Sequence, residues 1–173
     1  MDLKAYSPHA CVMFHTQLIQ EASRLLERCR AAGVRIASAE SCTGGLISAL
    51  LTDIPGSSDV FDRGFITYSN QAKRELLDVQ AATLTQHGAV SQLVALQMAE
   101  GALAHSDADL AVSVTGIAGP GGGTEQKPVG LVHFGCARRG EQTMHDQENF
   151  SGSRSEIRLE AVRHALRMLG SRV

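Results

Sequence analysis

The sequence predicts a single α/β domain in which helices cover a mixed β-sheet. Three observations predict it. Apolar segments with the spacing of strands alternate with amphipathic segments with the spacing of helices along most of the chain. Two strand-like segments near the end of the chain are separated only by a short turn, which makes at least one pair of strands antiparallel. The length of 173 residues corresponds to about one domain of ordinary size.

The first helix follows an irregular lead-in. Residues 1–12 show no clear period and include Pro8, so we expect them to be loosely ordered, with the domain itself at residues 13–173. From Phe14 onward, apolar residues recur every three or four positions with charged residues between them. This spacing predicts an amphipathic helix that ends at Gly33.

The later elements show the same signals. A short buried strand at residues 34–39 is followed by the polar segment 40–45, after which a second helix begins at Leu46 and stops near Pro55. Next, in chain order, come a strand at 61–68, a helix containing 72–77 that Asn70 caps, a short helix at 81–87 closed by Gly88, a longer helix from Ser91 to about Ala104, a continuous apolar strand at 109–115, and two strands at 129–137 and 143–150 joined by a turn at 138–140. Ser153 and Glu156 then form an S-x-x-E capping box ahead of a final helix.

Composition excludes several classes of protein. Hydrophobic residues make up 43% and charged residues 20%, which is typical of a globular protein and excludes a disordered or fibrous one. The 16 Lys and Arg residues against 18 Asp and Glu give a net charge of −2, so no basic field attracts DNA or RNA. Aromatic residues are only 4%, which leaves few platforms for stacking bases. We therefore expect no nucleic-acid partner.

The cysteine and histidine patterns predict a cytosolic protein without a metal ion. The four cysteines are spread along the chain with no C-x-x-C pair, which argues against a disulfide scaffold or a zinc ribbon and favours reduced thiols. The N-terminus lacks the apolar region of a signal peptide, and no window approaches about 18 uninterrupted apolar residues. We expect neither secretion nor a membrane span. The seven histidines show no metal-ligand spacing.

Ser41 is a candidate nucleophile because it lies between a predicted strand and the Gly44-Gly45 start of a helix. The unpaired N–H groups of a first helical turn carry partial positive charge and stabilise an oxyanion. The alternative is that Ser41 or Thr43 only caps the helix. Cys42 is a rival nucleophile, but it has no evident His or Lys partner in the sequence, and we interpret it as a small core residue.

A serine nucleophile needs a base, and Tyr68 and Lys73 lie five residues apart across the end of a strand and the start of a helix. A lysine accepts a proton from serine only if desolvation or a nearby cation lowers its pKa, and a tyrosine can relay that proton. The alternative places Lys73 on a solvated polar face and Tyr68 at a strand edge. Glu40 has two similar interpretations, as a polar partner for a substrate or as a surface carboxylate.

The segment from Thr115 to Thr124 contains five glycines and directly follows a buried strand. We interpret it as a loop whose backbone amides surround an anion such as a phosphate, although it matches neither of the common nucleotide-loop motifs. The alternative is a long flexible connection between two strands.

Four motifs together resemble the CinA C-terminal domain family. They are AESCTGG at 39–45, GFITYSNQAK at 64–73, QHGAVS at 86–91 and SVTGIAGPGGGTEQKPVG at 113–130. The resemblance spans roughly residues 14–170 and implies a three-layer α/β/α sandwich. It also implies a bacterial nicotinamide-nucleotide amidase, an amidohydrolase that converts nicotinamide mononucleotide and water to nicotinate mononucleotide and ammonia in pyridine-nucleotide recycling. The chain is too short for the molybdopterin-binding-like domain that other members carry, so it resembles the stand-alone form.

The resemblance places the family's serine, tyrosine and lysine on Ser41, Tyr68 and Lys73. We hypothesise that Lys73, neutral and assisted by Tyr68, removes the Ser41 proton as that oxygen attacks the carboxamide carbon, which gives an acyl-enzyme without a metal or cofactor. The groups expected to bind the substrate lie at the helix start and along the glycine segment, and they are Thr43, Gly44, Gly45, Thr115, Gly116, Gly119, Gly121 and Lys127.

The resemblance leaves the assembly and two other functions open. We expect a homo-oligomer, because the family tends to associate. The main alternative function is a non-catalytic nucleotide-binding accessory protein linked to competence or DNA damage. A hydrolase with a different substrate is the other. Binding of the mononucleotide without turnover would favour the accessory protein.

Overall fold

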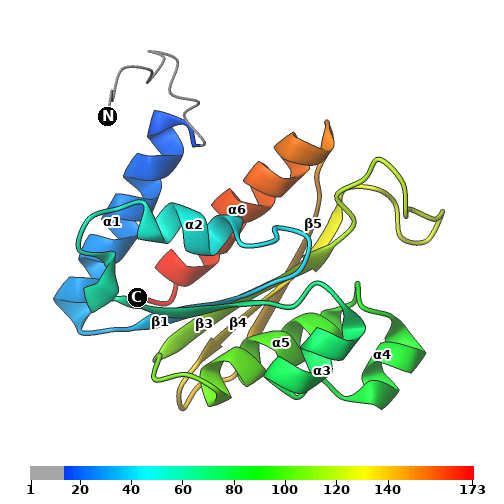
Figure 1. Ribbon diagram of the computed structural model, residues 1–173, viewed down its shortest axis with the longest axis horizontal. Coiled ribbons are helices and arrows are strands. Elements are labelled where there is room, and N and C mark those ends of the chain that lie inside the picture. Colours follow the sequence, from blue (N-terminus) through cyan, green and yellow to red (C-terminus); the bar gives the residue numbers. More distant parts are fainter. Residues whose placement is uncertain (1–13) are drawn as a thin grey trace, which may run out of the picture.

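The computed structural model describes residues 14–173, which form three layers, a five-stranded sheet with helices on both faces (Figure 1). The elements in chain order are α1 (Thr16–Ala32), β1 (Ile36–Glu40), α2 (Leu46–Thr52), a 3₁₀ turn (Ser57–Asp59), β2 (Phe61–Ile66), α3 (Asn70–Leu77), α4 (Ala81–His87), α5 (Gln92–Ala104), β3 (Leu110–Gly116), β4 (Leu131–Arg138), β5 (Met144–Asn149) and α6 (Arg154–Gly170). Helices α1, α2 and α6 lie on one face and α3, α4 and α5 on the other (Figure 1). The predicted α/β sandwich is confirmed. The predicted lead-in at residues 1–12 lies outside the described residues.

The sheet has the strand order β2-β1-β3-β4-β5. Strands β2, β1 and β3 are parallel, whereas β4 runs antiparallel to β3 and β5 antiparallel to β4. The predicted mixed sheet and late hairpin are therefore confirmed. Because the parallel strands end at one edge of the sheet, the loops that follow β1, β2 and β3 emerge together. The register pairs Glu40 with both Ile66 and Val114, which brings the residues after each strand side by side at that edge.

Helix α5 holds α3 tightly against the domain. Its residues Val94, Met98 and Ala102 are completely buried because the helix lies between the sheet and α3. Gly101 faces α3, where an added Cβ would overlap the carbonyl oxygen of Leu77. Only glycine allows this close approach of the two backbones. This close packing fixes the position of α3, the helix that carries Lys73.

The ends of the elements show which local signals were interpreted correctly. Gly33 ends α1 in a left-handed conformation (φ 65°), and the capping box of Ser153 and Glu156 opens α6, both as predicted. The predicted cap of α3 is wrong. Ser69 is the cap, since its hydroxyl accepts from the backbone N–H of Ala72 at 3.0 Å, and Asn70 is the first helical residue. Two adjacent residues able to cap a helix cannot be ranked without the backbone angles that precede them.

No helix within residues 14–173 combines the length and the apolar character needed to cross a bilayer.

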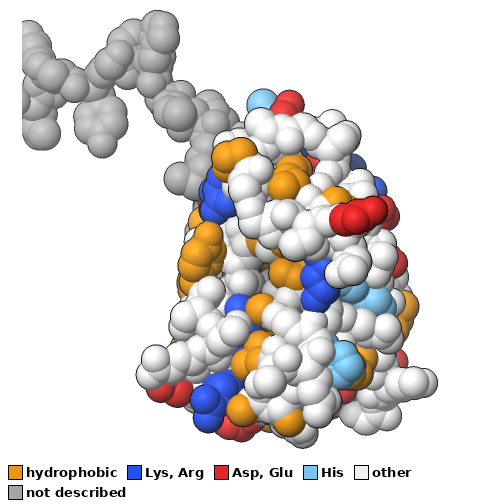
Figure 2. Space-filling model, turned by 90° about the vertical axis from the view of Figure 1, so that its right-hand side faces the viewer, with side chains coloured by type: hydrophobic (Ala, Val, Ile, Leu, Met, Phe, Trp, Pro, Cys, Tyr) orange, Lys and Arg blue, Asp and Glu red, His pale blue; other side chains and the backbone are white. Residues whose placement is uncertain are grey.

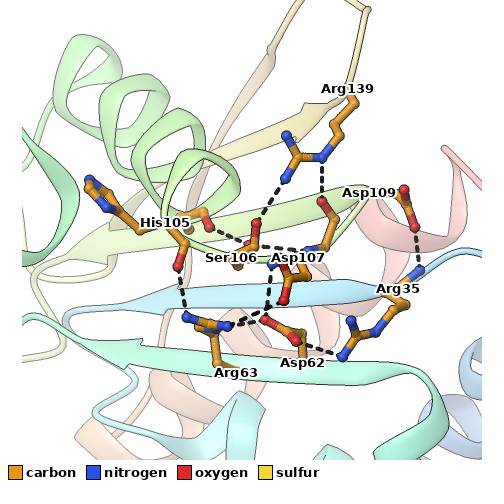
Figure 3. Close-up of polar contacts among 10 residues, drawn as sticks. Arg35, Asp62, Arg63, His105, Ser106, Asp107, Asp109 and Arg139 are labelled. Atoms are coloured by element: carbon orange, nitrogen blue, oxygen red, sulfur yellow. Dashed lines mark hydrogen bonds and ion pairs between the residues drawn. The ribbon is translucent and has the colours of Figure 1, made fainter.

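A polar network joins the opposite edge of the sheet, where the parallel strands begin (Figure 3). The Asp62 carboxylate accepts from Arg35 Nη2 and Arg63 Nε, both at 2.6 Å, and from the backbone N–H of Asp107 at 3.3 Å. Arg35 in turn donates its backbone N–H to Asp109 at 2.8 Å. The Asp62 side chain is only 6% exposed, so its charge is compensated by the two guanidinium groups.

Replacing Asp62 by asparagine is expected to lower the free energy of unfolding by about 1–3 kcal/mol at pH 7, because two guanidinium groups lose their charged partner. Burial by itself raises the pKa of the Asp62 carboxyl, but the hydrogen bonds from Arg63 and Asp107 and the nearby guanidinium charges hold that pKa below its ordinary 3.8. A carboxyl whose pKa is lower when folded stabilises the protein above its unfolded pKa, and this contribution is lost as the pH falls through the folded pKa.

Urea unfolding of the wild type and Asp62→Asn at pH 7 and below pH 4 should therefore show a difference that shrinks in acid. Asp59→Asn serves as the control, since its side chain is 65% exposed and its contact with Arg30 is 3.6 Å. A difference for Asp62→Asn no larger than that of the control at pH 7 would refute the prediction.

Candidate active site

Ser41 directly follows β1 and is held at the sheet edge by backbone hydrogen bonds. Its N–H donates to the carbonyl of Val114 in β3 at 2.9 Å, and its carbonyl accepts from the N–H of Gly44 at 3.1 Å. Gly44 and Gly45 have φ angles of 59° and 96°, which turn the chain back so that α2 begins at Leu46. The side chain of Ser41 is half-buried at the edge where the parallel strands end.

Lys73 reaches Ser41 from α3. Its Nζ lies 3.0 Å from Ser41 Oγ and donates to the carbonyl of Thr67 at 2.8 Å. The residue is only 1% exposed, although its sequence neighbours Gln71, Arg74 and Glu75 are exposed. The interpretation of Lys73 as a solvated residue on a polar face is therefore wrong. It lies on the buried face of α3 together with Leu77, one turn later.

Burial gives this lysine an unusual acidity. Removing the ammonium group from water disfavours its charged form and lowers the pKa of Lys73 from 10.5 to about 8. An appreciable fraction of the side chain is then the neutral amine near neutral pH, which can accept a proton from a hydroxyl 3.0 Å away. The pair has the geometry of a nucleophile and its base.

Tyr68 lies at the rim of this site. Its side chain is 63% exposed, and its hydroxyl accepts from Arg154 Nη2 at 3.0 Å. Within residues 14–173 it forms no hydrogen bond to Ser41 or Lys73. The structure thus brings Ser41 and Lys73 into contact. Tyr68 lies outside this pair, in the loop after β2, and contacts the start of α6.

Glu40 is neither a surface carboxylate nor open to a substrate. It is completely buried, and its two oxygens accept from the backbone N–H groups of Gly45, Ile47 and Ser48 at 2.9–3.1 Å. It also accepts from the Ser48 hydroxyl at 2.7 Å. Glu40 therefore caps the start of α2 from inside the domain, and it fixes the turn that begins with Ser41.

The helix start offers fewer free amides than its position suggests. The N–H of Gly44 bonds to the Ser41 carbonyl and that of Gly45 to Glu40. Among the residues that the structure describes, the N–H groups of Cys42 and Thr43 form no hydrogen bond. These two are the donors closest to Ser41 in sequence that remain open to a developing oxyanion.

Cys42 packs in the core, as its interpretation from the sequence predicted. It is 6% exposed and belongs to the apolar cluster formed by α1, α2 and α6. Burial raises the pKa of the Cys42 thiol to about 12, which keeps it protonated at neutral pH. The Cys42 thiol is therefore poorly suited to act as a nucleophile at neutral pH.

Two arginines of α6 complete the site, and sequence reasoning missed both. Arg154 donates to the carbonyl of Gly119 at 2.7 Å as well as to Tyr68, so it connects the glycine segment with the rim. Arg158, one turn later on the same face, donates to the carbonyls of Cys42 at 3.1 Å and Thr43 at 2.7 Å. One signal was available, because cations in the first turns of a helix oppose its dipole and need another reason to be there.

The predicted substrate-binding residues of the glycine segment lie at the same edge of the sheet. Thr115 is buried and donates its hydroxyl to the carbonyl of Ala89 at 2.8 Å. Gly116 ends β3, Gly119 is buried with its carbonyl held by Arg154, and Gly121 is exposed. At the other end, Lys127 Nζ donates to the carbonyls of His87 and Val90 at 2.6 and 2.7 Å, which ties the segment to the connection between α4 and α5.

The edge is polar as a whole. Figure 2 looks at the molecule from the right-hand side of Figure 1, where the loops after the parallel strands emerge, and shows apolar side chains only in small groups between polar and basic ones. A cavity of about 470 Å³ beside Lys127 is lined by His87, Ser91 and His133, among others. Within residues 14–173, no group of three or more His, Cys, Asp or Glu side chains is arranged to hold a metal ion.

Comparisons with known proteins agree on one family. The model of the CinA C-terminal domain matches residues 18–173. The nicotinamide-nucleotide amidohydrolase PncC of Escherichia coli (strain K12) is 46% identical over 157 residues, which are 91% of this chain and 95% of that protein. The protein of the same name from Enterobacter agglomerans is 54% identical over 133 residues, 77% of this chain and 81% of that protein.

The solved structures agree with this result. The competence/damage inducible protein CihA of Agrobacterium tumefaciens superposes with a TM-score of 0.89 at 51% identity, covering 91% of this chain and 96% of that one. A CinA superfamily protein of Escherichia coli superposes with a TM-score of 0.86 at 33% identity, covering 92% of this chain and 94% of that one.

Proposed function

Because this chain belongs to the CinA C-terminal domain family, we propose that it hydrolyses the carboxamide of nicotinamide mononucleotide to nicotinate mononucleotide and ammonia. One observation carries the proposal, the 3.0 Å separation of Ser41 Oγ and the Nζ of the buried Lys73. Within the described part of the chain, Lys73 has no carboxylate partner, so an ion pair does not account for its burial. A role as the base of a nucleophile, which needs a lowered pKa, does account for the burial of Lys73.

Acylation begins with the neutral amine of Lys73. One of its N–H groups bonds to the Thr67 carbonyl, which leaves the nitrogen lone pair free to point toward Ser41. The amine takes the hydroxyl proton as Ser41 Oγ attacks the carboxamide carbon, and the carbonyl electrons move onto oxygen. The open N–H of Thr43 stabilises the resulting oxyanion. Lys73 then returns its proton to the amide nitrogen, the C–N bond breaks and ammonia leaves.

Deacylation uses the same groups in the same order. Water takes the place of ammonia, and the neutral Lys73 removes one of its protons as the water oxygen attacks the ester carbon of the acyl-enzyme. When the second tetrahedral intermediate collapses, the Ser41 oxygen leaves with the proton from Lys73. The carboxylic acid product and the resting pair are formed, and the acid then loses its remaining proton to the solvent or to the released ammonia to give the carboxylate, in steps that use no metal or cofactor.

The mononucleotide extends from Ser41 along the edge where the glycine segment lies. Arg154 is an exposed cation between Gly119 and Tyr68, and this position suits a phosphate or ribose oxygen of a substrate whose carboxamide reaches Ser41. We propose that it acts together with the groups expected from the sequence to bind the substrate, which are Thr43, Gly44, Gly45, Thr115, Gly116, Gly119, Gly121 and Lys127.

The direct test is an assay of ammonia release by the purified chain. Nicotinamide mononucleotide, free nicotinamide, the dinucleotide and simple amides such as glutamine form a panel of substrates. The proposal expects turnover of the mononucleotide, with the carboxylate product identified by mass spectrometry. Tight binding of the mononucleotide without ammonia release would instead support the alternative, a nucleotide-binding accessory protein linked to competence or DNA damage, and turnover of another amide alone would replace the substrate.

Replacing Tyr68 by phenylalanine is expected to lower kcat by about 10-fold, because the hydroxyl that assists proton transfer at the rim of the site is lost. The thermal midpoint should stay unchanged, since the side chain is 63% exposed and its hydroxyl has the single partner Arg154 among the described residues. Initial rates of ammonia release over a range of substrate concentrations give kcat and KM. An unchanged kcat would remove Tyr68 from the chemistry, and a rise in KM alone would make it a binding residue.

Three other expectations remain part of the proposal. The reaction would recycle pyridine nucleotides, the chain would act in the cytosol, and it would work as a homo-oligomer. Gel filtration with light scattering measures the last of these directly.

A further inference from the structure

Arg158 forms hydrogen bonds to two peptide groups of the turn at residues 41–45, which we call the nucleophile loop. Its Nε donates to the carbonyl of Cys42 and its Nη2 to that of Thr43, at 3.1 and 2.7 Å. The side chain is half-buried, and within residues 14–173 it takes part in no ion pair. A guanidinium placed in this way stabilises the orientation of the two carbonyls, since its fork of donors fits two acceptors at once.

Because each peptide unit is planar, the contacts of Arg158 also fix the directions of two backbone N–H groups. In a trans peptide the N–H points opposite to the C=O of the same unit. The carbonyl of Cys42 shares its peptide with the N–H of Thr43, and the carbonyl of Thr43 shares its peptide with the N–H of Gly44. Arg158 therefore directs both N–H groups away from α6. That of Gly44 bonds to the Ser41 carbonyl, and that of Thr43 is left open.

The loop is shaped to accept the guanidinium. Gly44 has a φ of 59°, and an added Cβ would lie only 3.4 Å from Arg158 Nη2. A larger residue would strain the backbone, and its Cβ would be in van der Waals contact with the guanidinium. A cation bonded to a carbonyl also polarises that peptide, which makes its N–H a stronger donor. This polarisation favours negative charge beside the N–H of Thr43.

We propose that Arg158 is a positioning residue, which holds the Cys42–Thr43 peptide so that the N–H of Thr43 is presented to the oxyanion that forms on the substrate at Ser41. The inference rests on the proposed amidase function and adds a group that acts through the backbone. Preorganised donors of this kind account for large parts of the rate of acyl transfer, because they need no reorientation as charge develops.

The test compares Arg158→Ala and Arg158→Lys with Arg163→Ala, which removes a guanidinium from the same helix but from a pair with Glu21 and Glu160. Loss of a whole oxyanion donor costs about 10²–10³ in kcat, so a displaced one is expected to cost about 10–100-fold in Arg158→Ala with KM changed less than about 3-fold. The kcat of Arg158→Lys should lie between those of the wild type and Arg158→Ala, since an ammonium cannot bond both carbonyls as a fork. Guanidinium added at concentrations far below denaturation should restore part of the activity of Arg158→Ala and leave Arg163→Ala unchanged.

The outcomes separate this inference from the proposed function. If the wild type releases no ammonia from the mononucleotide, the function itself fails. In that case the rate at which a fluorophosphonate labels Ser41 still decides the inference, since this reaction also places negative charge on oxygen at the same position. If the wild type is active and Arg158→Ala keeps kcat within 2-fold, the inference alone is overturned. If Arg158→Ala does not fold, Arg158→Lys decides, and a wild-type kcat for it would contradict the proposal.

Discussion

Ser41→Ala is expected to reduce ammonia release from nicotinamide mononucleotide by about 10³-fold or more while leaving the fold intact. In the proposed mechanism the serine oxygen forms and breaks the bonds with the substrate carbon, and the thiol of the neighbouring Cys42 cannot replace it, because Cys42 is buried and holds its proton. The residual rate would come from substrate binding and the oxyanion donors alone. Initial rates of ammonia release, with circular dichroism and thermal midpoints as checks on folding, provide the measurement.

A matched control is Ser58→Ala, an exposed serine in the 3₁₀ turn before β2, which should retain full activity. The mononucleotide should still bind to Ser41→Ala, since the groups that hold it are unchanged, and calorimetry can show this. Turnover by Ser41→Ala at a rate near that of the wild type would exclude the serine route. Mass spectrometry of wild-type protein quenched during turnover should show an adduct of the pyridine carboxyl on the peptide that contains Ser41.

Lys73→Met is expected to remove nearly all activity and to raise stability at neutral pH. The first effect follows from loss of the base, and it should equal the loss in Ser41→Ala because the two residues act as one unit. A double variant should be no less active than either single one. Lys73→Arg tests the charge, since arginine keeps its proton under all these conditions and cannot act as a base.

The pH dependence identifies the protonation state that works. With the pKa of Lys73 lowered to about 8, the neutral amine increases as the pH rises through 8, so kcat/KM should rise with pH and level off above it. Rates of ammonia release between pH 6 and 9.5 measure this profile in buffers of constant ionic strength. A rate that is independent of pH across this range would argue against a lysine base.

The same pKa fixes the sign of the stability effect. The folded protein disfavours the charged lysine, so below pH 8, where both states bind the proton, the full cost is present. Between pH 8 and about 10.5 the unfolded chain binds more protons, and the stability of the wild type rises. The free energy of unfolding of Lys73→Met at pH 7 should therefore be higher than that of the wild type by on the order of 1–3 kcal/mol, after allowing for the lost hydrogen bond to Thr67. Its thermal midpoint should be higher as well, and both differences should shrink above pH 8. A Lys73→Met protein less stable than the wild type at pH 7 would contradict this account.

Local patterns in the sequence were sufficient for the elements of the fold, and they failed where a side chain acts across the sheet. The strand and helix periods, Gly33 at the end of α1 and the capping box of α6 are all decided by residues within one or two turns. The burial of Lys73 is not decided by such nearby residues. Its neighbours in sequence are exposed and polar, and only the placement of α3 against α5 and beside the loop after β1 takes its amine out of water.

Glu40 and the two arginines show the same limit. Glu40 caps α2 from five positions before the first of its backbone donors, which is outside any capping rule based on adjacent positions. Arg158 acts on a loop more than 100 residues earlier in the chain, and Arg154 on the residues after β2 and β3. Parallel strand order decides which of these segments meet, and that order is a property of the whole sheet.

The nucleophile loop comes from the first quarter of the chain and its two carbonyls are bonded by the last helix. During synthesis, a polypeptide that still lacks α6 has Ser41 and Lys73 but not the guanidinium of Arg158 behind them. These two hydrogen bonds therefore form only after the final twenty residues have been made, and under the proposed role of Arg158 a premature stop codon or a proteolytic nick ahead of Arg154 would leave the Cys42–Thr43 peptide without its positioning group.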